Sequence, residues 1–329
     1  MSLCLFLKRG LALLLCAVAF VVAPPALLEA VPAPQRAAVP GLPALDAEGY
    51  LPEPGGEFVY KDYEAGYWLY LSNTLQVEIT RFEDSKKPLV WYESILKCRG
   101  ETRVDGILCN PKNPGVGQLM PDVIAQRGHY VFAVNDDFFG DRYYDKTTMG
   151  IVLRDGKVYS RKTYQNDAIS VPNMETMALL PDGSIRVFKS KELTPEAYVG
   201  MEAQDVFSFG PVLIREGEVN PKLRKRYTRK EPRNAFGMVA PGHYVSLIVE
   251  GRHKASEGTG LEWMALRMQE LGVTDALNLD GGQTVALVFM GEKLNTTGKY
   301  GRGEVVRRVS GMLVLGTSDQ VVETTQRKK

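Results

Sequence analysis

The sequence has little cysteine and histidine and almost no excess of charge. Its 329 residues include four cysteines and three histidines. There is no Cys-x-x-Cys pair, and His129, His243 and His253 show no ligand spacing, which excludes the common zinc sites. Forty basic and thirty-nine acidic residues give a formal net charge of +1, so the chain lacks the overall charge of a nucleic-acid-binding protein and we expect no nucleic-acid partner. The basic run 222–230 is a local exception that a solvated loop explains.

Long hydrophobic runs are also missing. The most apolar stretch, residues 11–23, has thirteen residues, whereas a membrane-spanning helix needs roughly 20. It follows Lys8 and Arg9 and precedes small residues and prolines, which is the order of a secretory signal peptide. A membrane anchor is the alternative. We expect a signal peptide over residues 1–30, a secreted or periplasmic protein, and no transmembrane segment in the mature chain.

The remaining composition is that of an ordinary globular domain, with 44% hydrophobic and 24% charged residues. Residues 31–66 are rich in proline and alanine and predict a linker and lead-in. From residue 67 to residue 316 there is no further break in composition and no internal repeat, which predicts a single domain. Residues 317–329 are polar and predict a frayed tail.

Two cysteines remain once the signal peptide is removed. Cys98 and Cys109 flank a polar stretch that contains glycine. In an exported chain an even pair of this kind predicts a disulfide that closes a small loop. Two free thiols are the alternative.

Short apolar runs interrupted by glycine turns dominate this domain. Five turns, at 155–156, 182–183, 216–217, 241–242 and 290–291, lie between apolar or alternating segments and predict β-hairpins. The sequence also predicts two helices, over residues 260–271 and 121–127. Thr259 and Glu262 have capping-box spacing at the start of the first helix, and Gly272 is its expected C-cap. The pattern predicts an α+β fold: a large, mostly antiparallel or mixed β-sheet core with few helices packed on it.

The segment Asn-Leu-Asp-Gly-Gly-Gln-Thr, residues 278–284, ends one of these strands. Alternation along the strand puts Asn278 and Asp280 on the same face. Gly281 and Gly282 expose backbone N–H groups and allow a ligand to approach closely. A simple turn closed by a carboxylate is the alternative interpretation.

Similar polar groups end two further strands. Asn135 and Asp137 share a face after the run 130–134, and Glu250 and Arg252 share a face after the run 247–249. Carboxylates and amides at converging strand ends suit a sugar, because they accept hydrogen bonds and stabilise an oxocarbenium-like state. Arg233, which opens another strand, could hold a phosphate together with Arg252.

The ordered set of motifs resembles the phosphodiester glycosidase family, which includes the catalytic domain of N-acetylglucosamine-1-phosphodiester alpha-N-acetylglucosaminidase. The resemblance covers roughly residues 67–316 and rests on four segments: 135–139, 233–237, 250–252 and 278–282. Asn295 and an arginine at Arg307 or Arg308 look like later family positions. The chain departs from the family pattern at four places: Asp136, Glu250, Gln283-Thr284 and Thr296-Thr297.

The resemblance implies hydrolysis of the bond between a sugar's anomeric carbon and a phosphodiester, as in a glycosyl-1-phosphodiester or a cell-envelope or exopolysaccharide glycan. It implies an exported bacterial member with a glycan or sugar-phosphodiester as substrate. The expected roles are as follows: Asp280 and Asp137 as acid/base or charge-stabilising pair; Glu250 as alternative base or as the residue that orients Arg252; Arg233, Arg252, Gly281 and Gly282 for phosphate; Asn135, Asn278 and Asn295 for sugar hydroxyls; and Arg308 for substrate.

Two other interpretations stay open. The same pocket in a non-catalytic glycan-binding module would use its carboxylates as hydroxyl acceptors and Tyr143, Tyr144 or Trp263 as stacking platforms. The reaction requires no cofactor, but Asp137 and Asp280 are candidate ligands for a divalent cation such as Ca²⁺ or Mg²⁺.

Overall fold

The short apolar runs form three β-sheets in the computed structural model, which describes residues 39–112, 117–137, 150–162, 174–298, 303–304 and 306–323. These residues belong to one unit, residues 34–329. The nine-stranded sheet has the order β1 (Phe58–Asp62), β2 (Tyr67–Leu71), β3 (Leu75–Asp84), β4 (Leu89–Cys98), β15 (His243–Val249), β14 (Arg233–Ala240), β16 (Asp275–Leu279), β12 (Val212–Arg215), β13 (Glu218–Val219).

Two five-stranded sheets complete the β structure. The first has the order β10 (Ile185–Phe188), β9 (Glu175–Leu179), β11 (Asp205–Phe209), β7 (Gly150–Arg154), β8 (Lys157–Lys162). The second has the order β18 (Glu292–Lys293), β17 (Leu287–Phe289), β6 (Tyr130–Asn135), β19 (Gly311–Thr317), β5 (Val104–Leu108). All pairings between these strands are antiparallel, in agreement with the sequence prediction.

All five predicted hairpins are confirmed: β7–β8, β9–β10, β12–β13, β14–β15 and β17–β18. The turn between β7 and β8 shows the physical reason. Asp155 and Gly156 have φ angles of 48° and 70°, the left-handed conformation that a two-residue hairpin turn requires at both positions.

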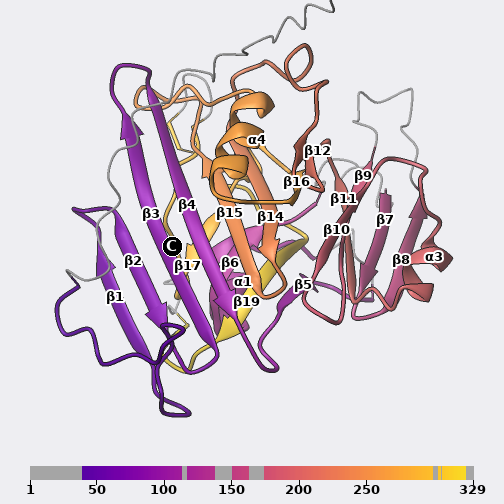
Figure 1. Ribbon diagram of the computed structural model, residues 1–329. Coiled ribbons are helices and arrows are strands. Elements are labelled where there is room, and N and C mark those ends of the chain that lie inside the picture. The colour runs from indigo at the N-terminus through magenta and orange to yellow at the C-terminus, as the bar shows by residue number, and fades with distance from the viewer. Residues whose placement is uncertain are drawn as a thin grey trace, which may run out of the picture. The chain divides into compact units, whose positions relative to one another are not determined.

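The three sheets share one hydrophobic core. It contains Val77 from the nine-stranded sheet, Phe207 from the first five-stranded sheet and Phe132 from the second. The opposite face of the nine-stranded sheet is covered by α4 (Leu261–Glu270), which packs Met264 and Met268 onto it. Figure 1 shows α4 lying across β14, β15 and β16. Since both faces of the central strands are buried, their ends hold fixed positions.

The described residues contain three α-helices, and two of them were predicted. α1 (Pro121–Arg127) and α4 agree with the sequence pattern, and Gly272 has the left-handed φ of 82° expected beyond α4. The predicted capping box is wrong, because Gly260 is the N-cap of α4 and no side chain caps it. The sequence analysis missed α3 (Pro195–Gly200), a short helix capped by the Thr194 hydroxyl. No helix in these ranges is long and apolar enough to cross a membrane.

The folded region extends beyond the predicted domain on both sides. β1 lies within the expected lead-in, and Val39 and Leu51 are buried against β2. In the expected tail, Val321 is completely buried. These residues are apolar positions in otherwise polar or proline-rich segments, and their burial stabilises the edge of the fold. The predicted signal peptide, residues 1–30, lies outside the described residues.

The predicted disulfide is wrong, because Cys98 and Cys109 are free thiols. Cys98 ends β4 in the nine-stranded sheet, whereas Cys109 follows β5 in another sheet, and its thiol donates a hydrogen bond to the carbonyl of Val309. The chain between the cysteines therefore crosses from one sheet to another instead of forming a small loop. Burial raises the pKa of both thiols to about 11, which keeps them unreactive near neutral pH.

Candidate functional site

The ends of β6, β14 and β16 meet at one side chain, the amide of Asn135. Its Nδ2 donates to the backbone carbonyl of Asp280 at 2.8 Å, and its Oδ1 accepts from the N–H of Ala286 at 3.0 Å and from Nδ2 of Asn234 at 3.1 Å. Asn135 is 1% exposed. The predicted role of Asn135 as a ligand of sugar hydroxyls is not supported, because its amide is occupied inside the protein. It instead fixes the backbone from which Asp280 projects.

The Asp280 carboxyl lies at this junction and is nearly buried. Its Oδ2 accepts a hydrogen bond of 2.7 Å from the Thr284 hydroxyl. Burial raises the pKa of Asp280 to about 6, and the negative charge of Asp137 adds to the rise, while Thr284 and the positive charge of Arg307 oppose it. A carboxyl group with this pKa exchanges protons close to neutral pH, as acid/base catalysis requires.

Asp136 and Asp137 share one buried cation, Arg154 of β7. One Nη atom of Arg154 lies 3.0 Å from Asp136 and 3.2 Å from Asp137. Asp137 also accepts a hydrogen bond from the N–H of Ser208 at 3.1 Å. Asp137 is 4% exposed and Asp280 is 9% exposed. The charge of Asp137 acts on Asp280, which is the more exposed of the two residues.

Glycines make room for this buried ion pair. A Cβ atom at Gly106 would lie 2.6 Å from Arg154, and one at Gly311 would lie 2.6 Å from the Asp136 carboxylate. Arg154 also stacks on the Phe207 ring, with 4.1 Å between the guanidinium carbon and the ring centroid. The arrangement needs small residues on β5 and β19 and a flat partner on β11.

A cluster of arginines lies on the other side of the Asp280 loop. Glu231 accepts from Arg252 and from Arg229, each at 2.6 Å. Arg233 donates to the carbonyls of Thr259 at 3.1 Å and Arg229 at 2.8 Å. Burial lowers the pKa of Arg233 to about 10, and the cations of Arg252 and Arg229 lower it further, against the attraction of Glu231. Three cations around one carboxylate form a local excess of positive charge suited to an anion.

Gly281 and Gly282 connect Asp280 to this arginine cluster. The Gly282 N–H donates to the Pro232 carbonyl at 2.9 Å, and the Gly281 N–H interacts with the Asp280 carboxylate and lowers its pKa. The predicted use of both amides for phosphate is therefore not supported. The glycines are needed for space: a Cβ at Gly281 would lie 2.8 Å from the Pro232 carbonyl, and one at Gly282 would lie 3.2 Å from the Arg252 guanidinium.

Glu231 pairs with Arg252, the role that the sequence analysis gave to Glu250. Glu250 accepts from the Tyr92 hydroxyl at 3.2 Å and from the Thr296 N–H at 2.6 Å. Burial raises its pKa, against the effect of the Thr296 N–H and His253. The alternation behind the prediction fails because β15 ends at Val249 and Arg252 has a φ of 65°, so the two side chains no longer share a strand face.

Of the other predicted substrate ligands, some are buried structural residues and one lies beside the site. Asn295 is buried and pairs with the backbone of Leu287 and Val285, which makes it a structural residue. Asn278 is also buried and donates to the Gly210 carbonyl at 2.8 Å. Arg308 is exposed, whereas Arg307 is half-buried and its charge reaches Asp280. Of the two arginines considered from the sequence, Arg307 is the one beside the site.

The described residues include some of the groups named in the two alternative interpretations. They contain no group of three His, Cys, Asp or Glu side chains that could hold a metal ion, and the carboxylate of Asp137 faces Arg154 and Ser208. Trp263 packs in the core against Trp91, with ring centroids 5.5 Å apart. Phe138, Phe139, Tyr143 and Tyr144 lie outside the described residues.

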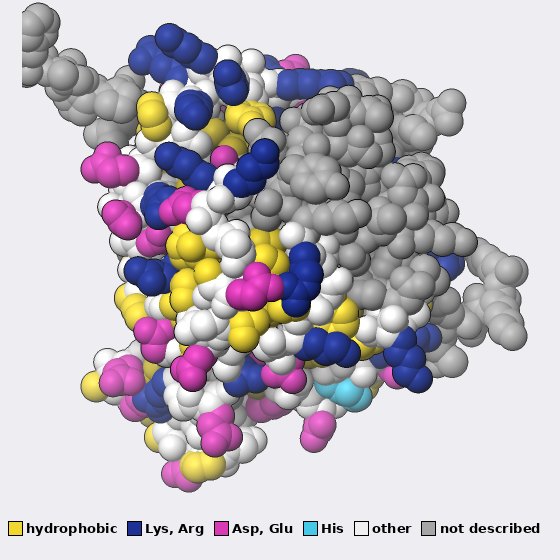
Figure 2. All heavy atoms as spheres, turned by 90° about the vertical axis from the view of Figure 1, so that its right-hand side faces the viewer, with side chains coloured by type: hydrophobic (Ala, Val, Ile, Leu, Met, Phe, Trp, Pro, Cys, Tyr) yellow, Lys and Arg dark blue, Asp and Glu magenta, His cyan; other side chains and the backbone are white. Residues whose placement is uncertain are grey.

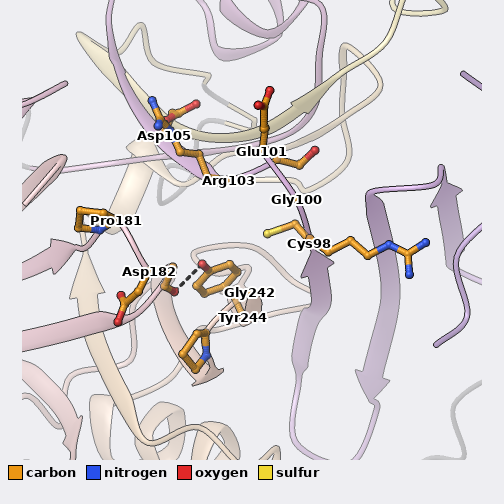
Figure 3. A pocket seen from close by; sticks show the side chains of 13 residues that line it. Cys98, Gly100, Glu101, Arg103, Asp105, Pro181, Asp182, Gly242 and Tyr244 are labelled. Carbon is orange, nitrogen blue, oxygen red and sulfur yellow. Dashed lines mark hydrogen bonds and ion pairs between the residues drawn. The ribbon is translucent and has the colours of Figure 1, made fainter. Parts of the chain in front are cut away.

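A separate open cavity of about 690 Å³ lies at the opposite end of the nine-stranded sheet. Figure 3 shows Cys98 and Tyr244 in its wall, with the Tyr244 hydroxyl donating to the Gly183 carbonyl at 2.7 Å. Its charged lining has both signs and consists of Arg99, Arg103, Glu101, Asp105 and Asp182. The cavity contains Cys98 and the hairpin turns 182–183 and 241–242, but none of the carboxylates or arginines of the Asp280 site.

Residues 128–315 match the model of one protein family, the phosphodiester glycosidases. The match contains Asn135, Arg154, Arg233, Arg252 and Asp280. The chain belongs to this family. A phosphodiester glycosidase domain thus carries both the buried carboxylates and the arginine cluster.

Individual proteins resemble this phosphodiester glycosidase domain more distantly. An uncharacterised protein of Bacillus subtilis (strain 168), YomE, derived from the SPbeta prophage, is 28% identical over 178 residues, which are 52% of this chain and 26% of YomE. The catalytic domain of zebrafish N-acetylglucosamine-1-phosphodiester alpha-N-acetylglucosaminidase, in a structure auto-inhibited by its pro-peptide, superposes with a TM-score of 0.58 at 18% identity, covering 75% of this chain and 85% of that chain. A hypothetical protein from Synechocystis gives 0.50 at 13% identity, covering 79% and 71%. These structural likenesses show the fold.

Three residues of the site escaped the sequence analysis: Arg154, Glu231 and Thr284. Arg154 stands in Ile-Val-Leu-Arg before the Asp-Gly turn, and a charged residue at the end of an apolar strand was the available signal. Glu231 directly follows the basic run 222–230, which drew attention away from it. Thr284 was noted only as a departure from the family pattern, although a hydroxyl four residues after Asp280 can reach its carboxylate.

Proposed function

We propose that this protein is an exported hydrolase that cleaves the bond between the anomeric carbon of a sugar and a phosphodiester. The observation that carries the proposal is the position of Asp280, between a buried set of charges and a cluster of arginines. Membership of the phosphodiester glycosidase family supports the same reaction class.

The arginines supply the phosphate site. Arg252 and Arg233 are pre-positioned by Glu231, by the Thr259 carbonyl and by the backbone of Arg229. Guanidinium groups bind phosphate oxygens in a fixed planar geometry. Because the net charge of this cluster is positive, a phosphodiester anion is stabilised there and gains further when negative charge develops on its leaving oxygen.

Asp280 supplies the proton chemistry. With a pKa of about 6, it is mostly ionised at pH 7 and can accept a proton from an attacking water or stabilise positive charge at the anomeric carbon. The leaving phosphomonoester is a weak base and needs little help from an acid. Asp137 and Arg154 act as positioning residues that set the charge around Asp280.

Export is part of the proposal and rests on the sequence of residues 1–30. A basic start, a thirteen-residue apolar run and small residues beyond it favour a cleaved signal peptide. A protein outside the cytoplasm meets glycosyl phosphodiesters of the cell envelope and of exopolysaccharides. Detection of the mature protein outside the cytoplasm tests this point.

The enzymatic proposal is tested with sugar-1-phosphodiesters as substrates. Purified protein is incubated with methyl diesters of several sugar 1-phosphates, and release of methyl phosphate is followed by phosphorus NMR, with and without chelator. We expect release by the wild type and a loss of at least about a hundredfold in kcat for Asp280→Asn.

The matched control is Glu64→Gln, the same change from carboxyl to amide at an exposed residue. It is expected to retain wild-type activity. Full activity of Asp280→Asn would remove Asp280 from the mechanism. Binding of a diester without release of methyl phosphate would replace the hydrolase by the glycan-binding module.

A further inference from the structure

The basic loop of residues 222–230 runs directly into the arginine cluster of the candidate site. Residues 222–233 contain seven Lys and Arg side chains and one acid, Glu231. Except for Leu223, every residue of the loop is exposed. Figure 2, viewed from the right-hand side of Figure 1, shows Lys and Arg side chains gathered at the top of that face. A net charge near zero for the whole chain thus hides a strongly positive local surface.

The loop is held in place and does not float freely. Leu223 is 1% exposed and packs in the core beneath α4. The Tyr227 carbonyl accepts from the N–H of Leu261, the first residue of α4, at 3.1 Å. The Arg229 carbonyl accepts from Arg233 at 2.8 Å. These three anchors fix the cations relative to Arg233 and Arg252.

Few acids balance these cations. Glu231 is paired with Arg229 and Arg252, Glu257 is paired with Lys230 at 2.6 Å, and the charge of Lys222 reaches Glu175. Within the described part of the chain, no ion pair involves the three central cations Arg224, Lys225 and Arg226. Mutual repulsion between these neighbours is relieved when an anion binds.

An exposed aromatic ring lies among the cations. Tyr227 is 40% exposed and has a φ of 60°, a conformation that few non-glycine residues adopt. A tyrosine ring of this kind offers an apolar face to a sugar and a hydroxyl to its polar groups. Basic residues precede and follow Tyr227 in the sequence, an order that matches alternating phosphates and sugar rings.

We propose that residues 222–230 form an additional binding subsite for a glycan whose sugars are joined by several phosphodiester groups. Arg224, Lys225 and Arg226 pair with phosphates away from the cleaved bond, and Tyr227 stacks on a sugar ring. This inference rests on the proposed function and defines its substrate class: a polyanionic polymer in preference to a single glycosyl phosphodiester.

The test compares a polymer with a monomer. The polymer is a chain of N-acetylglucosamine units linked through 1-phosphodiesters, and the monomer is the methyl diester of N-acetylglucosamine 1-phosphate. The variant carries Arg224→Gln, Lys225→Gln and Arg226→Gln. We expect KM for the polymer to rise about tenfold, since each exposed ion pair adds a modest increment, and its dependence on salt to weaken. Kinetics with the monomer stay within about twofold.

A matched control removes three exposed cations elsewhere, through Lys86→Gln, Lys87→Gln and Lys157→Gln. It is expected to behave as the wild type on both substrates. A second variant, Tyr227→Asn, keeps a residue that tolerates the left-handed conformation and is expected to weaken polymer binding while the thermal unfolding midpoint stays unchanged.

Three results would overturn the proposal: an unchanged KM for the polymer in the triple variant, an equal loss on polymer and monomer, or binding of single-stranded DNA as tight as that of the polymer. Failure of the proposed function gives a different pattern. If the wild type cleaves neither substrate, polymer binding is measured directly by calorimetry. Binding that is lost in the triple variant and kept in the control then supports the subsite, and equal binding by both variants overturns it.

Discussion

A single carboxyl group, Asp280, links the stability of the protein to its chemistry. Its pKa is raised to about 6 from the ordinary value of 3.8, chiefly by burial. The folded state therefore holds this proton more tightly than the unfolded state does. The resulting stabilisation is complete below pH 4 and is lost as the pH rises through 6. The difference of about 2 pKa units corresponds to about 3 kcal/mol.

Asp280→Asn should remove this pH dependence, because an amide cannot ionise. We expect the free energy of unfolding of the variant, minus that of the wild type, to increase by up to about 3 kcal/mol between pH 4 and pH 7. Urea unfolding at several pH values measures the difference. Asp205, whose pKa burial also raises to about 6, is present in both proteins and cancels. A constant difference would show that the Asp280 pKa is not raised.

The sequence predicted which strand ends form the site, but it did not predict the role of each residue there. Asn135, Asp137 and Asp280 follow predictable strands, so their meeting at one place could be inferred. Which hydrogen bonds an amide makes depends on partners distant in the chain: Asn135 pairs with Asn234 and Ala286. Arg154 and Glu231 needed the structure, because only tertiary packing brings them to Asp136 and Arg252.

At the scale of secondary-structure elements, Arg154 joins the two five-stranded sheets. It lies in β7, donates to the Val206 carbonyl of β11 at 2.7 Å, and pairs with the carboxylates that follow β6. Removing a buried cation leaves its partners as unpaired buried charges, which costs more than a lost surface pair.

We expect Arg154→Met to lower the free energy of unfolding by about 3–5 kcal/mol. Guanidinium or urea unfolding followed by circular dichroism provides the measurement. The comparison is Arg161→Met on the neighbouring strand β8, whose ion pair with Glu196 is exposed and should contribute less than about 1 kcal/mol. Equal effects of the two changes would mean that the buried pairing does not hold the sheets together.

Element prediction succeeded where local chemistry decides the structure. The hairpins follow from turns in which a glycine takes positive φ, and α4 follows from its apolar stripe. Strand order within the sheets, such as β4 beside β15, joins segments far apart in the chain and leaves no local signal. The six-residue helix α3 is too short to show a periodic pattern.

At the scale of the whole molecule, the segment before residue 67 belongs to the fold. Phe58 and Tyr60 of β1 pack with Val39 and Leu51 against Leu69 and its neighbours on β2. A proline-rich composition masked these apolar positions in the sequence. Without them, β2 would become an exposed edge strand with one bare apolar face, which favours aggregation.

A protein that begins at residue 39 should therefore be as stable as the 329-residue chain. One that begins at residue 67 should be less stable by at least about 3 kcal/mol, because two or more large apolar side chains lose their burial. Thermal unfolding and size-exclusion chromatography of the two fragments measure the effect. Equal stability of the two fragments would mean that the domain begins at residue 67, as the composition of the sequence indicated.

In the proposed reaction, the excess of arginine around Glu231 also affects the release of the product. A phosphodiester has one negative charge, whereas a phosphomonoester has close to two at neutral pH. Arg229, Arg233 and Arg252 therefore attract the product more strongly than the substrate. If the proposed reaction holds, we expect departure of the phosphomonoester to limit turnover and free phosphate to compete for the same arginines, so that activity falls as product accumulates.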